Sequence, residues 1–202
     1  MSQTGKNLPD TEFERILREY QKTIVVCEQK PARQFFLCPV GLVGAGKTTV
    51  LKPLAERLFL VRVSTDEIRK ILKDREYDYE RAGEMAQELI KNFAKEGYSV
   101  AIDADCVNKK EDIEKLAKEV GAKIIWLHIN PSEEFIINKL RNFKNGWLAE
   151  DNEEMVRNYF ERKPRHQKLN FPFLYTFDTS RDNLEKQIKE AAELIKEEIK
   201  IR

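Results

Sequence analysis

The stretch QFFLCPVGLVGAGKTT, residues 34–49, joins a short apolar run to a glycine-rich loop. From Gly41 onward it contains the pattern G-x-x-x-x-G-K-T. Glycines let the backbone turn tightly and bring its N–H groups close to phosphate oxygens, and a helix that begins near Lys47 adds the positive end of its dipole. Because the pattern lies between an expected strand and an expected helix, it predicts a phosphate-binding loop and not a chance glycine turn.

Similar apolar runs alternate with helical patterns along the rest of the chain. Runs rich in β-branched and aromatic residues predict strands at 34–40, 59–64, 99–104, 123–129 and 174–179. Helical spacing of apolar residues predicts helices at 10–29, 47–58, 66–73, 79–96, 109–119, 132–141, 152–163 and 182–201. Apolar strands that alternate with helices are typical of a parallel sheet covered on both faces. We therefore expect a three-layer α/β/α sandwich with a mainly parallel five-stranded sheet, whose ligands bind at the carboxyl ends of the strands.

The composition argues against a disordered or membrane protein. Of 202 residues, 41% are hydrophobic and 35% charged, and no apolar run approaches the ~20 residues that span a bilayer. The net charge of +1 gives no overall attraction to nucleic acid. Three cysteines without a C-x-x-C pair indicate reduced thiols, and the first thirty residues lack the apolar core of a signal peptide. We expect a cytoplasmic protein without membrane contact.

The chain divides into an N-terminal helical extension, residues 1–33, and a main domain, residues 34–202. In the extension, Thr11 and Glu14 match a capping box at the start of the first helix. The sequence predicts no oligomeric state.

The phosphate loop itself indicates a donor and a metal ion. Lys47 is expected to reach the β- and γ-phosphates, and the Thr48 hydroxyl is an expected ligand of Mg²⁺. No guanine-binding motif is present, so ATP is the expected donor. The expected ATP-binding residues of the loop are Gly41, Val43, Gly44, Ala45, Gly46, Lys47, Thr48 and Thr49.

Other nucleotide-binding classes lack their motifs here. A GTPase carries N-K-x-D and D-x-x-G, but the nearest matches, NKKE at 108–111 and DADC at 103–106, differ at the deciding positions. The L-S-G-G-Q segment of transporter ATPases is missing, and the chain is too short for the extra helical domain of ring ATPases. Two classes remain: a small kinase, and a nucleotide-binding protein without catalytic activity.

A second group of polar residues follows the expected strand at 59–64. Asp66 lies just past its end and Arg69 one helical turn later, so both are expected to face the cleft beside the loop. A kinase needs a carboxylate there to accept the proton of the attacking hydroxyl, and a cation to bind an anionic acceptor. The alternative is that Asp66 caps the next helix, and one carboxylate can do both.

A third group follows the expected strand at 99–104. Asp103, at its end, has the position of a carboxylate that holds Mg²⁺ directly or through water. Alternatively, Asp103 is a structural partner of Lys47 or Thr48. Asp105 is expected only to cap the following helix.

These motifs resemble the P-loop kinase domain of the 5′-hydroxyl polynucleotide kinases and, more loosely, the zeta-toxin and small-molecule kinases of the same AAA-type P-loop NTPase superfamily. The resemblance covers about residues 35–180. It rests on the phosphate loop, on D-E-I-R at 66–69 matching the family's D-x-x-R, and on I-D-A-D at 102–105. A further stretch, KLRNFKNGWLAEDNEEMVRNYFERK at 139–163, is similar to the family's arginine lid and the helix after it.

The resemblance implies roles for individual residues. Asp66 would be the general base, Arg69 a contact to the acceptor's phosphate, and Arg141 a lid residue on the donor's phosphates; with Lys47, Asp66 and Arg141 are the expected catalytic residues. Lys144 takes the place of a second basic residue in a helical lid at about 141–172. The chain departs from the family at Asp105, where phage-type enzymes have asparagine, and at Val43, which replaces a frequent proline.

A lid that closes over the phosphates excludes water and directs the phosphoryl group to the acceptor. Asp178 and Thr179 are expected, by resemblance, to line the donor's base pocket. Neither His128 nor His166 is expected to bind a ligand, and the aromatic residues near the lid are expected to pack in the core or at a hinge: Tyr159, Phe160, Phe171 and Phe173. We expect transfer of the γ-phosphate of ATP to a 5′-OH polynucleotide or nucleotide-like end. A nucleoside, sugar or amino-sugar kinase and a non-catalytic ATP-binding switch are the alternatives.

Overall fold

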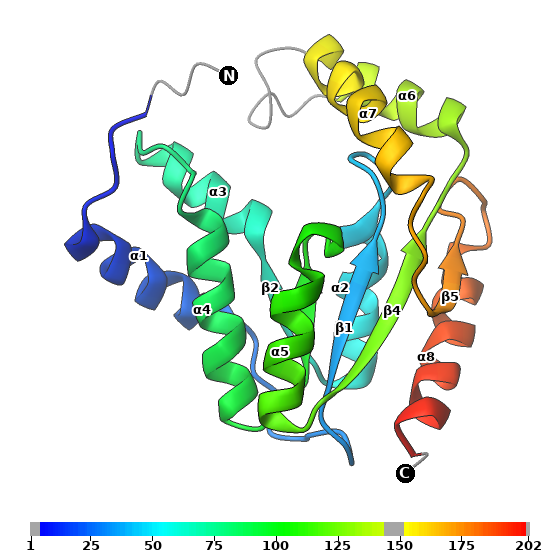
Figure 1. Ribbon diagram of the computed structural model, residues 1–202, viewed down its shortest axis with the longest axis horizontal. Coiled ribbons are helices and arrows are strands. Elements are labelled where there is room, and N and C mark those ends of the chain that lie inside the picture. The colour runs from blue at the N-terminus through cyan, green and yellow to red at the C-terminus, as the bar shows by residue number, and fades with distance from the viewer. Residues whose placement is uncertain (1–4, 144–151, 201–202) are drawn as a thin grey trace.

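The computed structural model describes residues 5–143 and 152–200. Eight α-helices and five strands follow one another along these residues (Figure 1). In chain order they are α1 (Asp10–Thr23), β1 (Phe35–Val40), α2 (Lys47–Leu58), β2 (Val61–Ser64), α3 (Thr65–Asp74), α4 (Ala82–Lys95), β3 (Val100–Asp103), the short 3₁₀ helix η1 (Val107–Lys109), α5 (Lys110–Val120), β4 (Lys123–Ile129), α6 (Glu133–Arg141), α7 (Asn152–His166), β5 (Phe173–Phe177) and α8 (Leu184–Lys200).

The five strands form one parallel sheet in the order β2-β3-β1-β4-β5. The prediction of a five-stranded α/β sandwich is confirmed. Strand β1 lies at the centre, and all six of its residues are buried, as expected for a strand covered on both faces. All strand carboxyl ends meet at one edge, so the loop after β1 lies between the residues that follow β3 and β4.

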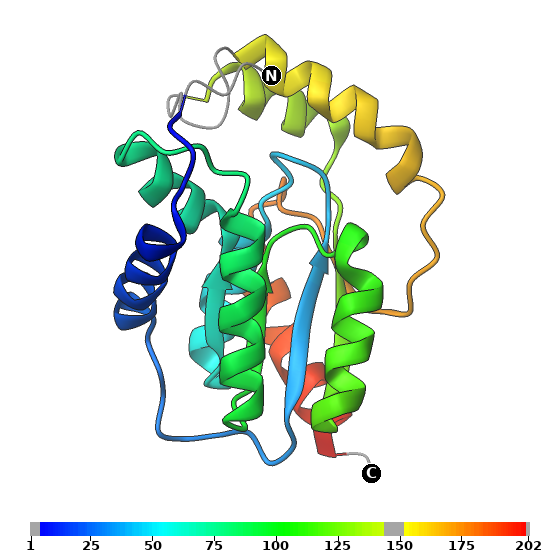
Figure 2. The ribbon, with the colours of Figure 1, turned by 60° about the vertical axis from the view of Figure 1, so that its left-hand side comes forward.

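Helices cover both faces of the sheet. In Figures 1 and 2, α4 and α5 lie on one face and α2 and α8 on the other. Side chains of β1 alternate between the two cores, as the period of a strand requires: Phe36 and Cys38 join one cluster, whereas Phe35 and Leu37 join the other. None of the helices in the described ranges is long and apolar enough to cross a bilayer.

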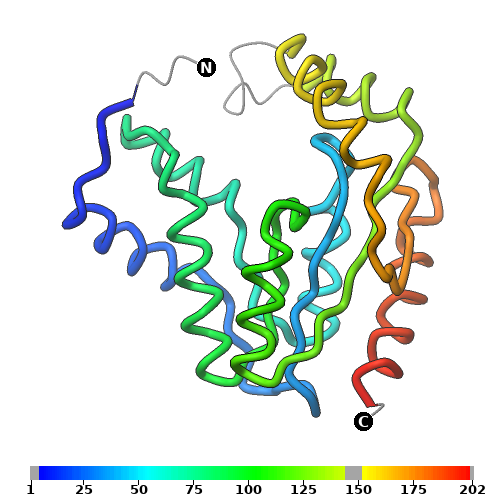
Figure 3. Tube along the Cα trace, in the orientation of Figure 1, coloured from blue at the N-terminus to red at the C-terminus, as the bar shows by residue number. Residues whose placement is uncertain are grey.

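Helix α1 differs from its prediction at both ends. It begins after Pro9, whose carbonyl accepts the first N–H bonds, so Thr11 lies inside the helix and the expected capping box with Glu14 is wrong. It ends at Thr23 and not at residue 29; Val25, just beyond, is 82% exposed, so no packing surface extends the helix. The tube in Figure 3 shows α1 beside α4. Four residues of α1 that share one face of the helix are buried: Phe13, Ile16, Leu17 and Tyr20.

Candidate active site

The phosphate loop connects β1 to α2 at the carboxyl edge of the sheet. Gly44 and Gly46 have φ angles of 79° and 94°, in the left-handed region that favours glycine. A Cβ atom at Gly44 would also lie 2.9 Å from Leu140 Cδ2. Helix α2 begins at Lys47, and its N-cap is Gly46, which has no side chain to cap it. The first N–H groups of α2 are therefore available to an anion.

Lys47 lies against its own loop. Its Nζ donates to the carbonyl oxygens of Gly41 at 2.8 Å and Leu42 at 3.0 Å. Burial lowers the pKa of Lys47, and the charges of three carboxylates oppose this shift: Asp105, Asp66 and Asp103. Residues from the ends of two neighbouring strands, β2 and β3, thus act on one ammonium group.

Asp103 is almost fully buried, with 3% of the residue exposed. Its Oδ1 accepts a hydrogen bond from the Thr48 hydroxyl at 3.0 Å, and its Oδ2 accepts one from Arg62 at 2.6 Å. Burial raises the pKa of Asp103, while Arg62 and Thr48 act to lower it. The contact with Thr48 that was considered as the alternative role of Asp103 is therefore present, and Arg62 is a partner that the sequence pattern did not indicate.

Asp66 lies in the first turn of α3, but it is not the cap. The side chain of Ser64 is the N-cap and accepts from the N–H of Glu67, so the alternative reading of Asp66 as a capping residue is wrong. Asp66 Oδ1 instead accepts from Arg69 at 2.9 Å. Both side chains are about half exposed, at 50% and 42%, so a molecule from solvent can reach them.

Asp105 pairs with His166, which comes from the end of α7. The distance from Asp105 Oδ2 to His166 Nε2 is 3.1 Å, and His166 is the less exposed of the two side chains. Burial raises the pKa of Asp105, but the hydrogen bond to His166 and the charge of Lys47 outweigh it and hold this pKa below its ordinary value. Since Cys106 is the N-cap of η1, the expectation that Asp105 caps the next helix is wrong.

Of the expected lid cations, Arg141 is paired with an acidic residue of α7. Arg141 Nε pairs with Glu153 at 3.2 Å, and both side chains are more than half exposed. Lys144 lies outside the described residues. Glu133 ties α6 to α7 because it accepts from Tyr159 at 3.0 Å and pairs with Lys163. Tyr159 is buried as expected, whereas Phe160 is 49% exposed and does not pack in the core.

After the last strand, Thr179 contacts the far end of the phosphate loop. Its hydroxyl donates to the carbonyl of Ala45 at 2.7 Å, and a Cβ atom at Gly46 would lie 3.2 Å from it. Asp178 bonds to Ser180 and Arg181 in its own turn. Thr179 therefore contacts the loop at the end away from Gly41.

Comparison with known proteins agrees with this geometry. A family model described as an AAA domain matches residues 37–146, which is more than half of the chain and contains the loop, Asp66 and both later aspartates. No functionally curated protein matches the chain at a significant level.

Several solved structures share the fold. A chain of the PezAT chromosomal toxin–antitoxin system of Streptococcus pneumoniae has a TM-score of 0.58 and 16% identity, with 98% of each chain covered. The APS kinase CysC of Mycobacterium tuberculosis, in complex with AMPPNP and APS, has a TM-score of 0.57 and 14% identity, covering 82% of this chain and 99% of that one. Shikimate kinase of Acinetobacter baumannii, in complex with shikimate, has a TM-score of 0.53 and 17% identity, covering 84% and 96%. These similarities establish a P-loop kinase-like fold.

Proposed function

The chain belongs to the AAA domain family, and from this membership and the geometry of the site we propose that it is an ATP-dependent phosphotransferase. It moves the γ-phosphate of ATP to a hydroxyl group, that of a 5′-OH polynucleotide or nucleotide-like end.

The observation that carries the proposal is the gathering of three carboxylates around Lys47. Asp105, Asp66 and Asp103 all act on this ammonium group; Asp66 follows β2, whereas Asp103 and Asp105 lie at the end of β3. A phosphate-loop lysine contacts the β- and γ-phosphates, so a carboxylate in its neighbourhood is close to the phosphorus that is transferred. ATP binding alone does not need such a carboxylate, whereas activation of a hydroxyl does.

In this mechanism Asp66 accepts the proton of the attacking hydroxyl. Its exposed carboxylate is oriented by Arg69, which also offers a cation to an anionic group of the acceptor. Lys47 supplies positive charge to the phosphates, and the backbone N–H groups at the start of α2 complete their cradle. Arg141 and Lys144 are the lid cations; Arg141 pairs with Glu153 through its Nε, and its side chain is more than half exposed.

The residues present fit Mg²⁺. This ion prefers hard oxygen ligands and is usually bound by one or two carboxylates together with substrate phosphates. The Thr48 hydroxyl and Asp103 carboxylate lie together beside the loop, and Arg62 engages only the other oxygen of Asp103. Thr48 would hold the ion, with Asp103 holding it directly or through water. When bound, the ion would supply positive charge next to the phosphates.

A small-molecule acceptor is the second candidate. Two of the similar folds are named as kinases of APS and of shikimate, both small molecules. A nucleoside, sugar or amino-sugar kinase would use the same loop and the same Asp66.

The proposal is tested with Asp66→Asn. We expect phosphorylation of the acceptor to fall by about 10²–10⁴-fold, because the variant cannot accept a proton, while ATP affinity stays unchanged. The matched control is Asp74→Asn, which removes an exposed carboxylate at the other end of α3. Labelled ATP is offered with oligonucleotides that carry 5′-OH or 5′-phosphate ends, and with nucleosides and sugars. Full activity of Asp66→Asn refutes the general base, and ATP binding without labelling of any acceptor supports a non-catalytic switch.

A further inference from the structure

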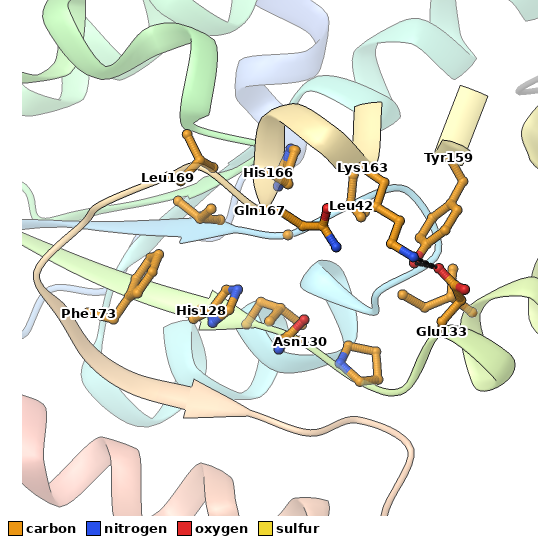
Figure 4. Close-up of a pocket in the computed structure, with 15 residues that line it drawn as sticks. Leu42, His128, Asn130, Glu133, Tyr159, Lys163, His166, Gln167, Leu169 and Phe173 are labelled. Carbon is orange, nitrogen blue, oxygen red and sulfur yellow. Dashed lines mark hydrogen bonds and ion pairs between the residues drawn. The ribbon is translucent and has the colours of Figure 1, made fainter. Parts of the chain in front are cut away.

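A cavity of about 410 Å³ lies beside the beginning of the phosphate loop. Its walls come from the end of β1, the connection from β4 to α6, and the last turns of α7 with the residues that follow (Figure 4). Its volume is within the range of about 300–1,000 Å³ that is usual for small-molecule sites. None of the side chains labelled in Figure 4 has a role in the transfer proposed above.

Glu133, Lys163 and His166, which line the described cavity, already have partners. Lys163 pairs with Glu133, and His166 pairs with Asp105. Burial, and then the charge of His166, lowers the pKa of His128, which favours a neutral imidazole. The cavity therefore suits an uncharged ligand group, because a phosphate or carboxylate would meet no unpaired cation among these residues.

Two amide side chains supply hydrogen-bonding groups. Figure 4 shows Asn130, after β4, and Gln167, after α7, facing each other across the cavity. Neither amide has a hydrogen-bond partner within the described chain, while their backbones are fixed by bonds to Phe177 and Lys163. Each amide can both donate and accept, which matches the mixed edge of a nucleobase.

An aromatic wall lies next to these amides. The ring of His128 stacks on that of Phe173, with centroids 4.6 Å apart and planes only 10° from parallel. Phe173 in turn stacks on Phe171. His128 lies in β4 and Asn130 is the first residue after it, and both line the cavity. Because Phe173 lies between His128 and Phe171, the outer face of His128 is the surface on which a flat ring can stack.

The cavity borders the loop at its terminal-phosphate end. It is lined by Gly41 and Leu42, whose carbonyls bind the Lys47 ammonium, and this lysine is expected to reach the β- and γ-phosphates. The other end of the loop, at Ala45 and Gly46, is in contact with Thr179. A molecule that reaches the loop from the cavity thus approaches from the side of the phosphate to be transferred.

We propose that this cavity binds the nucleobase of the acceptor. The inference rests on the proposed function and narrows its substrate class: the acceptor contains a nucleoside, free or at a polynucleotide 5′ end. A base is neutral and planar, and carries donors and acceptors on its edge, as the walls require. A sugar has no flat ring to stack on the aromatic wall, and an anionic group would find no unpaired cation among the described residues of the cavity.

The test measures binding of uridine and adenosine by calorimetric or NMR titration, with the donor site filled by the ATP analogue AMPPNP. We expect Gln167→Leu and Asn130→Leu each to weaken nucleoside binding by about tenfold, since each loses a hydrogen bond to the base and leaves a polar edge unpaired. ATP affinity stays unchanged. The matched control is Gln87→Leu, which removes a glutamine of α4 that bonds to Asp112 on the surface and leaves nucleoside binding intact.

Three results would overturn the inference. The first is equal nucleoside affinity in the wild type and both cavity variants, and the second is free ribose binding as tightly as the nucleosides. The third is a loss of ATP affinity in place of nucleoside affinity, which would assign the cavity to the donor's base. These titrations need no turnover and are repeated in Asp66→Asn. A failure of phosphotransfer is therefore recognised separately from a failure of base binding.

Discussion

Asp103 depends on Arg62 for its charge. The carboxylate is buried between Thr48 and Arg62, and the exposed fraction of the Arg62 side chain is only 17%. Burial raises the pKa of Asp103 and the arginine opposes this effect. A carboxylate that binds a metal ion next to phosphates must be ionised. Arg62 therefore supports the site by favouring the ionised form of Asp103.

We expect Arg62→Met to destabilise the protein by about 3–5 kcal/mol, because it leaves a buried carboxylate without its cation. The variant raises the pKa of Asp103 further above its ordinary value of 3.8. A carboxyl group whose pKa is higher in the folded state binds its proton more tightly there, so its contribution to stability is lost as pH rises through the folded pKa. The destabilisation should therefore be larger at pH 7 than at about pH 5 in urea unfolding.

The control for this prediction is Arg57→Met, which removes an exposed pair with Glu185 and should change stability by less than about 1 kcal/mol. A loss for Arg62→Met that is the same at both pH values would contradict the explanation.

At the scale of single residues, the sequence alone predicts part of the candidate active site. The loop, Asp66 and Asp103 each come directly after an apolar strand, and parallel strands bring their carboxyl ends together, so their proximity follows from local pattern. Arg62 and His166 could not be found this way. Their partners Asp103 and Asp105 are 41 and 61 residues away along the chain, and only the pairing of strands and the docking of α7 brings them together.

At the scale of the secondary structure elements, α1 contacts the first turn of α3, which carries the proposed general base Asp66, through one hydroxyl group. Buried Tyr20 donates to Glu67 Oε2 at 3.0 Å and accepts from the N–H of Ser64 at 3.0 Å. These residues flank Asp66 at the start of α3. Burial raises the pKa of Tyr20, which therefore stays protonated. The helix thus positions the turn that carries Asp66.

We expect Tyr20→Phe to lower kcat by about tenfold without a change in the KM for ATP, because a small shift of the turn moves Asp66 but not the phosphate loop. Loss of the partner for the Ser64 N–H should also cost about 1–3 kcal/mol of stability. Both are measured well below the melting temperature of the variant. Tyr98→Phe is the control, since within the described chain its hydroxyl has no hydrogen bond; an equal effect of the two variants on kcat would rule out a positioning role for Tyr20.

The cores of the elements follow from their sequence periods, but their ends do not. The apolar stripe of α1 and the alternation along β1 are visible in the chain as written. The early end of α1 is not, because it depends on which surface the helix meets. Similarly, Ser64 and not Asp66 caps α3, because the helix begins at Thr65, directly after β2.

Over the whole molecule, α1 belongs to a core that also contains the centre of the sheet. Ile16 of α1 and Phe36 of β1 are fully buried members of one hydrophobic cluster, together with Ile102 of β3. The boundary between an extension at 1–33 and a main domain at 34–202 stays a prediction, and this cluster offers a way to test it.

We expect Ile16→Ala to destabilise the entire protein by about 2–5 kcal/mol in one cooperative transition, because the cavity forms in a shared core. Thermal and urea unfolding, followed both by far-ultraviolet circular dichroism and by tryptophan fluorescence, measure the effect. Val25→Ala, at an 82% exposed position just after α1, is the control and should have almost no effect. Two separate transitions, with the second unchanged, would instead support an independent extension.

The order of the strands has a consequence for behaviour on warming. The phosphate loop follows β1, which is bonded to a neighbour on either side, whereas Asp66 follows β2, a four-residue border strand that pairs only with β3 in the sheet described here. Edge strands have fewer hydrogen-bonded neighbours, so we expect them to unfold locally before central strands do. Heat would thus displace the proton acceptor while the nucleotide cradle stays intact, and a warmed sample would stop turning over before it stopped retaining ATP.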